Sequence, residues 1–414
     1  MARLLLLIST TSYRASDFVG AAHRLGVEVI VGSNRRQALE KLSGGGTVTI
    51  DFRDLDKGVS QIAALARARP LAAIVGVDDE TTGLAAKAAA ALGLAHNPPE
   101  SVATAANKHR FRGALARAGL PSPAFRLLSV DDDPERAARE ATFPCVLKPT
   151  ALAASRGVIR ADDGPAFVAA FRRIVRILDQ PDVAPLGEAA RQILVEDYLP
   201  GVEVALEGLL DRGRLHVLAL FDKPDPLAGP FFEETIYITP SRLSRTAQDD
   251  IAEATGNAVA ALGLREGPIH AELRVNDEGP WVIEVAARSI GGLCSRALRF
   301  GAGIGLEELI VRHALGLPIA SLERERRPAG VMMLPIPATG VLREVRGLDE
   351  ARGVRGVEDV RIAIPLGQPV VPLPEGSKYL GFVFARDETP GAVETALREA
   401  HRRLEFVIEP APDR

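Results

Sequence analysis

Residues 269–288, which read IHAELRVNDEGPWVIEVAAR, decide the fold of the region around them. Apolar and polar residues alternate in two runs, and such alternation is typical of strands that bury one face. The segment Asp277-Glu278-Gly279 between the runs predicts a three-residue turn with glycine in the left-handed position. We therefore predict a β-hairpin in which Asn276 pairs with Pro280 and every apolar position faces the same side.

The predicted register places two glutamates, Glu272 and Glu284, directly opposite each other. Like charges that face each other across a sheet destabilise it, so a fold that keeps them is expected to supply a cation. Two carboxylates are ligands that Mg²⁺ takes while it also binds phosphates. The hairpin thus predicts a magnesium site. The alternative is a pair of surface glutamates that form ion pairs with Arg274 and Arg288.

Lysine is rare in this chain: only seven of the fifty lysine and arginine residues are lysine. Arginine serves almost everywhere on the surface, so a retained lysine indicates a place that needs a compact ammonium group. Three lysines have informative neighbours: Lys108 follows an asparagine, whereas Lys148 and Lys223 each follow an apolar run and precede a proline. These three are candidate functional cations. The alternative is that they lie by chance at solvated strand ends.

Length, charge and cysteine content exclude several classes of protein. A chain of 414 residues is too long for one core, which predicts two to four domains. The net charge of −4 and the lack of a basic tract with interleaved aromatics argue against a nucleic-acid partner. The apolar run 4–8 is too short for a secretory segment and predicts a strand, and no run approaches a membrane span. Two solitary cysteines, Cys145 and Cys294, fit a reducing compartment, so we expect a cytoplasmic protein without a membrane partner.

The first hundred residues alternate between strand and helix patterns, which predicts a parallel, Rossmann-like sheet. We expect strands at 3–9, 27–32, 47–51 and 71–77, helices at 15–25, 59–69 and 82–92, and a helical turn at 37–42. The first strand is followed by STTSYRAS and not by a glycine-rich fingerprint, which argues against dinucleotide binding. The loops 9–13 and 76–80 would open toward a ligand crevice. We nevertheless favour a solvated loop for Asp78, Asp79 and Glu80 over contact with substrate.

The rest of the chain divides into mixed α and β units. We expect a helix at 101–118, then a small unit with strands at 145–148 and 192–196, a loop at 151–157 and a helix at 165–178. Strands at 202–210 and 214–221, a mobile Pro/Gly-rich loop at 224–232 and helices at 249–262 and 305–315 follow. The tail mixes short strands with an amphipathic helix at 390–404. The predicted domains are 1–96, 97–322 with a lid at about 121–200, and an α+β appendage at 323–414.

Five motifs occur in an order that resembles the ATP-grasp ligases over about residues 97–317. They are ANKHRFRGALARAGLPSP, FPCVLKPTALAASRGV, ILVEDYLPGVEV, LFDKP, and HAEL followed by VIEVAARSIGG. The loop ASRGV, the hairpin segment EVAAR and the tail are similar to the branch that includes bacterial L-amino-acid ligases. The resemblance implies a Rossmann-like N-terminal domain, an ATP-grasp fold and a C-terminal α+β domain.

The resemblance also implies roles for individual residues in binding ATP. Lys108 and Lys148 would lie along the α- and β-phosphates, and Lys223 would approach the γ-phosphate. The loop 153–158 would close over the phosphates through backbone N–H groups, although Ala153 and Ala154 replace the commoner glycine pair. The loop residues assigned to the nucleotide are Ser155 and Gly157. The residues expected along the adenine are Glu196, Asp197, Tyr198 and Leu199.

The remaining roles concern the ribose, the metal and the reacting groups. Glu203 would accept the ribose hydroxyls, or it is a solvated glutamate on a strand. Glu272 and Glu284 would bind Mg²⁺, with Mn²⁺ as a substitute, although Ala286 stands where many relatives have asparagine. Arg288 would stabilise an acyl phosphate and an oxyanion, or it pairs with Glu272. For His270 we favour a structural hydrogen bond over catalysis.

By resemblance, the function is that of an ATP-dependent carboxylate–amine ligase with small-molecule, amino-acid-like substrates. Such an enzyme forms an amide through an acyl phosphate. Two alternatives stay open: a bicarbonate-using enzyme of carboxylase or carbamoyl-phosphate type, and a protein that binds ATP without chemistry. The sequence names neither substrate. It does not fix the oligomeric state, although homodimers are common in the family.

Overall fold

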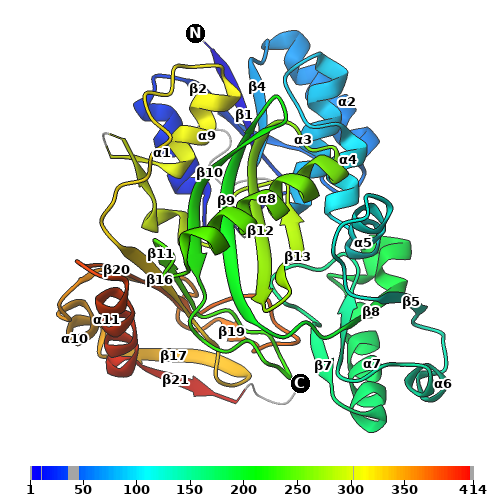
Figure 1. Cartoon of the computed structure of the whole chain (residues 1–414). Coiled ribbons are helices and arrows are strands. Elements are labelled where there is room, and N and C mark those ends of the chain that lie inside the picture. The colour runs from blue at the N-terminus through cyan, green and yellow to red at the C-terminus, as the bar shows by residue number, and fades with distance from the viewer. Residues whose placement is uncertain (1, 11, 36–45, 302, 411–414) are drawn as a thin grey trace.

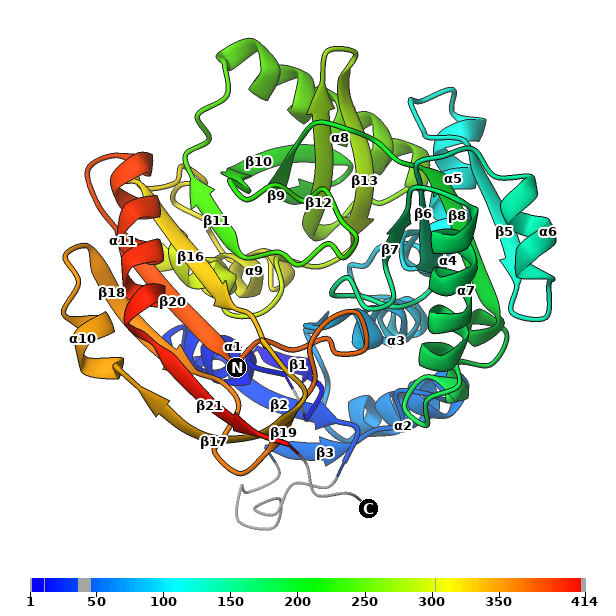
Figure 2. The ribbon, with the colours of Figure 1, turned by 90° about the horizontal axis from the view of Figure 1, so that it is seen from below.

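The computed structural model describes residues 2–10, 12–35, 46–301 and 303–410, so the helical turn expected at 37–42 lies outside the described residues. In the described residues, three sheets of four, eight and four strands carry the architecture, and two small sheets of two and three strands accompany them. Figures 1 and 2 show the chain from two directions. No helix within these described ranges is both long and apolar enough to cross a membrane.

The N-terminal unit is a four-stranded parallel sheet in the order β3-β2-β1-β4, which confirms the Rossmann-like expectation. Leucines 4–7 of β1 are fully buried because helices cover both faces of the sheet. The elements are β1 (Arg3–Leu7), α1 (Ala15–Arg24), β2 (Glu28–Ser33), β3 (Thr47–Thr49), α2 (Leu55–Ala68), β4 (Ala73–Gly76) and α3 (Asp79–Leu92).

The helix expected at 101–118 is two helices, α4 (Pro99–Ala105) and α5 (Lys108–Arg117). The break has a physical cause, because Asn107 has extended backbone and its side chain accepts a hydrogen bond from the N–H of Arg110. This N-cap starts a new helix. As a result Lys108 stands at the first position of α5.

The next unit is a four-stranded antiparallel sheet in the order β5-β8-β6-β7, and α7 packs on β6 and β7. Its core is apolar and separate from the other cores. The elements are β5 (Phe125–Ser129), α6 (Pro134–Arg139), β6 (Cys145–Pro149), β7 (Ile159–Ala161), α7 (Gly164–Leu178), η1 (Ala184–Arg191) and β8 (Gln192–Asp197). We call this unit the lid.

The largest sheet has eight strands in the order β13-β12-β9-β10-β11-β16-β20-β18. Its first half comes from the middle of the chain: β9 (Val202–Asp211), β10 (Arg214–Asp222), β11 (Ile236–Thr239), α8 (Arg245–Leu262), β12 (Gly267–Asn276) and β13 (Gly279–Ala286). A segment with η2 (Cys294–Ala297), β14 (Arg299–Phe300), β15 (Ile304–Gly305) and α9 (Leu306–Ala314) follows.

The C-terminal block continues this sheet, because β16 pairs with β11 and then with β20. The block is α+β, as expected, but its strands are part of the central sheet across the predicted boundary at 323. Its elements are β16 (Ala329–Leu334), β17 (Gly340–Arg346), α10 (Leu348–Arg352), β18 (Val357–Ile362), β19 (Pro369–Val370), β20 (Gly381–Arg386), α11 (Pro390–Arg403) and β21 (Glu405–Glu409).

The predicted hairpin is present as β12 and β13, but its turn is tighter than expected. Asn276 pairs with Gly279, so the connection has two residues and not three. The Asn276 side chain favours this turn, because its Oδ1 accepts a hydrogen bond from the N–H of Glu278 at 2.9 Å. The predicted pairing of Asn276 with Pro280 is therefore wrong.

A β-bulge nevertheless brings the two acids together. The register shifts by one residue between Glu272 and Leu273, so Leu273 pairs with Val282 while Glu272 pairs with Glu284. Ile283 is the extra residue, and it lines a cavity instead of joining the apolar face. The prediction that Glu272 faces Glu284 is confirmed, whereas the prediction of one common apolar face is wrong for Ile283 and for Trp281, which pairs with Arg274.

Candidate active site

One cavity of about 500 Å³ lies between the N-terminal sheet, the lid, the hairpin and the C-terminal block. It collects most of the residues that the sequence singled out, although they are spread over almost two hundred positions. The predicted site residues on its wall are Lys108, Lys148, Ser155, Glu196, Asp197, Tyr198, Leu199, Glu203, Glu272, Glu284 and Arg288. Gly157 and Lys223 lie just behind the wall.

Each of the two facing acids contacts a lysine. Lys223 Nζ lies 3.2 Å from Glu272, and Lys108 Nζ lies 3.1 Å from Glu284. The alternative, in which Arg274 and Arg288 neutralise these glutamates, is wrong. The cations are the scarce lysines, so the acids and the lysines form one electrostatic unit.

Lys148 belongs to a buried group of three charges. Its Nζ donates to Glu196 at 2.5 Å, and Arg112 donates to the same carboxylate through Nε at 2.7 Å and Nη2 at 3.2 Å. Burial alone raises the pKa of Glu196, but Arg112 and Lys148 outweigh it and hold the pKa at about 2. Burial lowers the pKa of Lys148, against the pull of Glu196. The carboxylate thus fixes the lysine at the end of β6, at the cavity wall.

Lys223 is enclosed by three carboxylates and is almost completely buried. Its Nζ lies 2.9 Å from Glu203, 2.5 Å from Glu234 and 3.2 Å from Glu272. Burial lowers its pKa, but the three acids raise it well above the usual value. In this arrangement the ammonium lies beneath the acids, so its assignment to the γ-phosphate stays a prediction.

Glu234, which was not predicted from the sequence, lines the cavity beside Glu272. Its carboxylate accepts from the hydroxyl of Tyr237 at 2.8 Å, and burial together with the charge of Glu272 raises its pKa to about 7. A signal was present in FFEETIYIT, where an acid precedes a buried strand. Nothing in that pattern shows which way the carboxylate points.

The carboxylates of this wall fit a hard divalent cation. Glu203, Glu234 and Glu272 each offer an oxygen, and these ligand atoms all lie within 4.8 Å of one another. Glu284 is paired with Glu272 across the hairpin. Oxygen ligands of this kind suit Mg²⁺, which keeps several waters and phosphate oxygens of its own.

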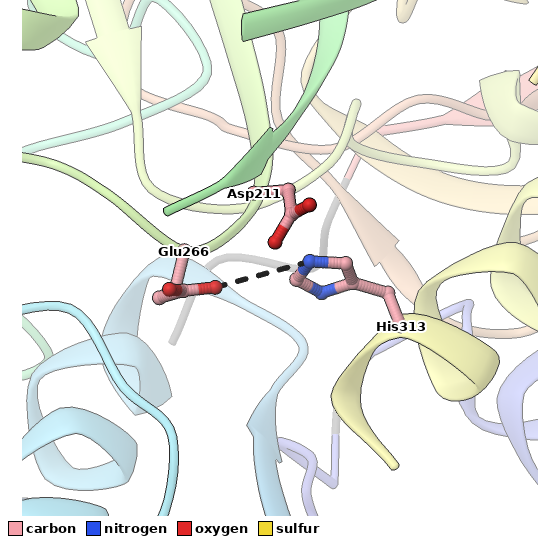
Figure 3. A group of neighbouring side chains, drawn as sticks. All are labelled: Asp211, Glu266 and His313. Carbon is pink, nitrogen blue, oxygen red and sulfur yellow. Dashed lines mark ion pairs between the residues drawn. The ribbon is translucent and has the colours of Figure 1, made fainter. Parts of the chain in front are cut away.

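A second group of three potential ligands lies outside the cavity and is drawn in Figure 3. His313 Nε2 is 3.9 Å from Glu266, and the carboxylate of Asp211 points toward the same ring. Arg212 Nε also lies 3.7 Å from Asp211, whose side chain is more than half exposed. Burial lowers the pKa of His313, so we interpret this group as polar contacts that join α9 to the ends of β9 and β12.

Arg288 does not pair with Glu272. Its Nε and Nη2 donate to both oxygens of Asp79 at 2.8 and 2.7 Å. Burial lowers the pKa of Arg288, but Asp79 outweighs it and raises the pKa above the usual value. Asp78, in turn, accepts from the hydroxyl of Ser12 at 2.9 Å. Asp78 is half-buried, whereas Asp79 and Glu80 remain exposed as expected, and all three line the cavity.

The loop 153–158 has an unusual backbone. Ala154 and Ser155 both have φ of 54°, in the left-handed region that favours glycine. The N–H of Gly157 already donates to the carbonyl of Pro374 at 2.9 Å, so its assignment to the nucleotide stays a prediction. A side chain at Gly157 would collide with Pro149, which accounts for the glycine there.

Two other expectations have clear outcomes. His270 makes the structural hydrogen bond that we favoured, with Nδ1 3.1 Å from Glu207. Burial lowers its pKa, but Glu207 and Glu272 outweigh it and raise the pKa to about 9.

The segment 224–232, expected to be mobile, packs against the lid, where the N–H of Arg160 donates to Pro230 at 2.9 Å. Its Phe232 ring lies 5.5 Å from the guanidinium of Arg274.

Family models match three parts of the chain. Residues 19–96 match an ATP-grasp N-terminal domain, residues 141–297 match an ATP-grasp domain, and residues 332–409 match the L-amino acid ligase C-terminal domain 2. The solved structure of an L-amino acid ligase from Bacillus licheniformis superposes with a TM-score of 0.84 at 27% identity, over 99% of both chains. The fold is therefore an ATP-grasp fold.

Two curated relatives extend the comparison. The uncharacterized protein y4rH of Sinorhizobium fredii is 24% identical over all of this chain and 84% of its own length. Alanine–anticapsin ligase of Bacillus subtilis is 28% identical over 55% of this chain and 50% of its own length. The aligned region thus spans about half the length of that ligase.

Proposed function

We propose that this ATP-grasp protein is an ATP-dependent ligase that joins the carboxylate of one amino-acid-like substrate to the amine of another. A carboxylate oxygen attacks the γ-phosphorus of ATP, and ADP leaves. The amine nitrogen then attacks the carbonyl carbon of the acyl phosphate and loses a proton. Phosphate leaves with the original carboxylate oxygen, so the products are an amide, ADP and phosphate.

The observation that carries this proposal is the convergence of opposite charges in one cavity. Lys108 and Lys148 supply point cations, and the facing pair Glu272 and Glu284 supplies oxygen ligands. A magnesium triphosphate needs both kinds of group, because the metal takes carboxylates while the ammonium groups neutralise phosphate oxygens. Without nucleotide these charges are balanced by ion pairs of Lys108 with Glu284, Lys148 with Glu196, and Lys223 with Glu272.

Each residue then has a definite task. Lys108 and Lys148 bind the α- and β-phosphates, and Ser155 and Gly157 position the loop over them. The adenine lies along Glu196, Asp197, Tyr198 and Leu199, with Glu203 at the ribose. Glu272 and Glu284 would hold Mg²⁺ or Mn²⁺, which supplies neutralising charge to the phosphates.

Two cations act closest to the reacting groups. Arg288 lines the same cavity, where its guanidinium would face the carboxylate that reacts and stabilise the developing oxyanion. Lys223 neutralises the acids around it and would approach the γ-phosphate. The names of alanine–anticapsin ligase and of the L-amino acid ligase support amino acids as the substrate class.

The test is a turnover assay with an isotope label. Purified protein receives ATP, Mg²⁺ and all pairs of the twenty L-amino acids, and mass spectrometry follows ADP, phosphate and amide. With an ¹⁸O-labelled carboxylate, the proposal predicts transfer of one ¹⁸O atom to phosphate per amide formed. Release of AMP, label in AMP, or a complete panel without turnover would contradict it.

A further inference from the structure

Arg14, in the loop after β1, is a buried cation on the cavity wall without an ion-pair partner. Its side chain is 2% exposed. Nη1 donates to the carbonyl of Val77 at 2.9 Å and more weakly to that of Ser289 at 3.4 Å, and Nη2 donates to the hydroxyl of Ser289. Nε has no acceptor. The contacts to Ser289 use the end of the guanidinium and leave the Nε edge unused.

Comparison with the other buried arginines shows how unusual this is. Among the described residues, four arginines are less than 5% exposed: Arg14, Arg112, Arg274 and Arg386. The other three each contact a carboxylate within 3.2 Å. No described carboxylate lies within 4 Å of Arg14, although Asp78, Glu207 and Glu307 act on it from farther away. A buried charge without a partner is costly, which indicates that the partner is a ligand.

The preceding residue, Tyr13, also has a buried polar group without a hydrogen-bond partner. Tyr13 also lines the cavity, and its buried hydroxyl has no hydrogen-bond partner. Burial raises the pKa of Tyr13, and the nearby backbone N–H of Tyr379 lowers it in part. An N–H cannot accept the hydroxyl proton, so that donor stays unused. Two consecutive residues of the cavity wall therefore leave donors unused.

This end of the cavity adjoins the proposed reaction centre. Arg288 donates to the carbonyl of Ser289 at 2.9 Å, and Arg14 contacts the same carbonyl. The edge of Arg288 that could grip a carboxylate is already filled by Asp79. The unused donors at this end belong to Arg14: its Nε–H has no acceptor, and one N–H of Nη2 remains beside the one that donates to Ser289. Together they suit the two oxygens of a carboxylate.

We propose that Arg14, assisted by the Tyr13 hydroxyl, binds the α-carboxylate of the amine-bearing substrate and selects for it. This inference rests on the proposed ligase function. In an α-amino acid two bonds separate the nitrogen from the carboxylate carbon, a distance below about 3 Å. An amine placed beside Arg288 for attack therefore brings its own carboxylate toward Arg14.

The test compares each L-amino acid with its α-carboxamide as the amine substrate. The wild type is expected to favour the acid by about 100-fold or more in kcat/KM, because a site built for a carboxylate rejects an analogue that lacks it. Arg14→Gln should lower kcat/KM for the acid by about 100-fold and change that for the amide by less than about threefold. Arg14→Lys should keep part of the preference, and Tyr13→Phe should lower it by less than Arg14→Gln.

The control is Ser289→Ala, which removes a contact of Arg14 and keeps the guanidinium. It should retain the preference for the acid. If Arg14 only fastens the loop to Val77 and Ser289, Arg14→Gln will lower kcat/KM for acid and amide equally, which would overturn the inference. Thermal unfolding of each variant shows whether it folds, and the lysine and phenylalanine variants serve if the glutamine variant does not.

A binding measurement separates this inference from the proposed function. Calorimetry with ADP and Mg²⁺ present titrates the full chain with each amino acid and its amide. Binding that prefers the acid and depends on Arg14, without ligation, would refute the ligase and support the subsite. Ligation that ignores the acid–amide difference would refute the subsite alone. Neither binding nor turnover would refute both.

Discussion

Lys148 is a buried lysine on the cavity wall, and its surroundings indicate a role in binding rather than in packing. It is held at the cavity wall by Glu196, and Lys108 and Lys378 line the same cavity. A compact ammonium at this place lowers the energy of a triphosphate and of the ADP that leaves.

Lys148→Met is therefore expected to lower kcat/KM for ATP by about 100-fold or more, because it removes a charge that acts on the phosphates. Lys87→Met is the matched control, since Lys87 is exposed and lies outside the cavity. Steady-state kinetics with ATP varied checks the effect. A loss below about threefold would contradict the role of Lys148.

Glu196 should make the free energy of unfolding depend on pH in the acidic range. Its pKa of about 2 in the folded chain lies below the usual 4.5, so its contribution is present above pH 4.5 and is lost as the pH falls toward 2. Glu196→Gln should destabilise the protein by about 3–5 kcal/mol at neutral pH, because Arg112 and Lys148 lose their partner. The difference from wild type should shrink by about 3 kcal/mol between pH 4.5 and 2. Urea unfolding across this range measures it, and a difference independent of pH would contradict the assignment.

The scarcity of lysine and the facing glutamates were visible in the sequence, because each rests on composition or on local alternation. Glu234, Asp79 and Arg14 were not predicted as site residues. Their positions in the cavity depend on where distant segments meet: Asp79 contacts a residue 209 positions away, and Arg14 one 275 positions away. No local pattern carries that information.

At the scale of elements, the hairpin shows which features the alternation of apolar and polar residues predicts and which it does not. Alternation predicted two strands and the facing pair, and both are present. The two-residue turn and the bulge each shift the register by one residue in compensating directions. Periodicity fixes the faces of a strand but does not reveal a bulge, which left Ile283 on the wrong side.

The loop 153–158 yields a prediction at this scale. Ala154 has a left-handed backbone, which costs an L-residue about 1–2 kcal/mol. Glycine adopts this conformation without that steric cost, and its main cost is the larger loss of chain entropy on folding. Ala154→Gly should stabilise the loop conformation by about 0.5–1 kcal/mol. Ala153→Gly, at a position without positive φ, should instead weaken it. Hydrogen exchange of residues 151–158 reports the change, and equal effects of both substitutions would contradict the backbone argument.

At the scale of the whole molecule, the C-terminal block forms part of the active site. It extends the central sheet through β16, and Ser377, Lys378 and Tyr379 line the cavity. The sequence predicted its α+β character from short strands and an amphipathic helix. Its attachment was not predictable, because β11 and β16 are about ninety residues apart and both are short.

The lid and the C-terminal block are joined by an ion pair. Arg173 of α7 donates to both oxygens of Glu375 at 2.6 and 2.9 Å. Breaking this pair with Arg173→Gln or Glu375→Gln should loosen the lid and raise KM for ATP by up to about fivefold, as expected for a partly exposed pair. The double variant should behave like either single variant. Arg172→Gln is the control, because Arg172 pairs with Glu135 within the lid. An equal rise in the control would contradict the joining role.

The account depends on one claim above all, that the facing acids and the scarce lysines together hold a metal triphosphate. Anomalous diffraction from crystals grown with Mn²⁺ and a non-hydrolysable ATP analogue tests it most directly. The account predicts manganese bound by oxygens of Glu272 and Glu284, with phosphate oxygens in hydrogen-bond contact with Lys108 and Lys148. Manganese at Asp211, Glu266 and His313 alone, or a nucleotide bound away from this hairpin, would contradict it.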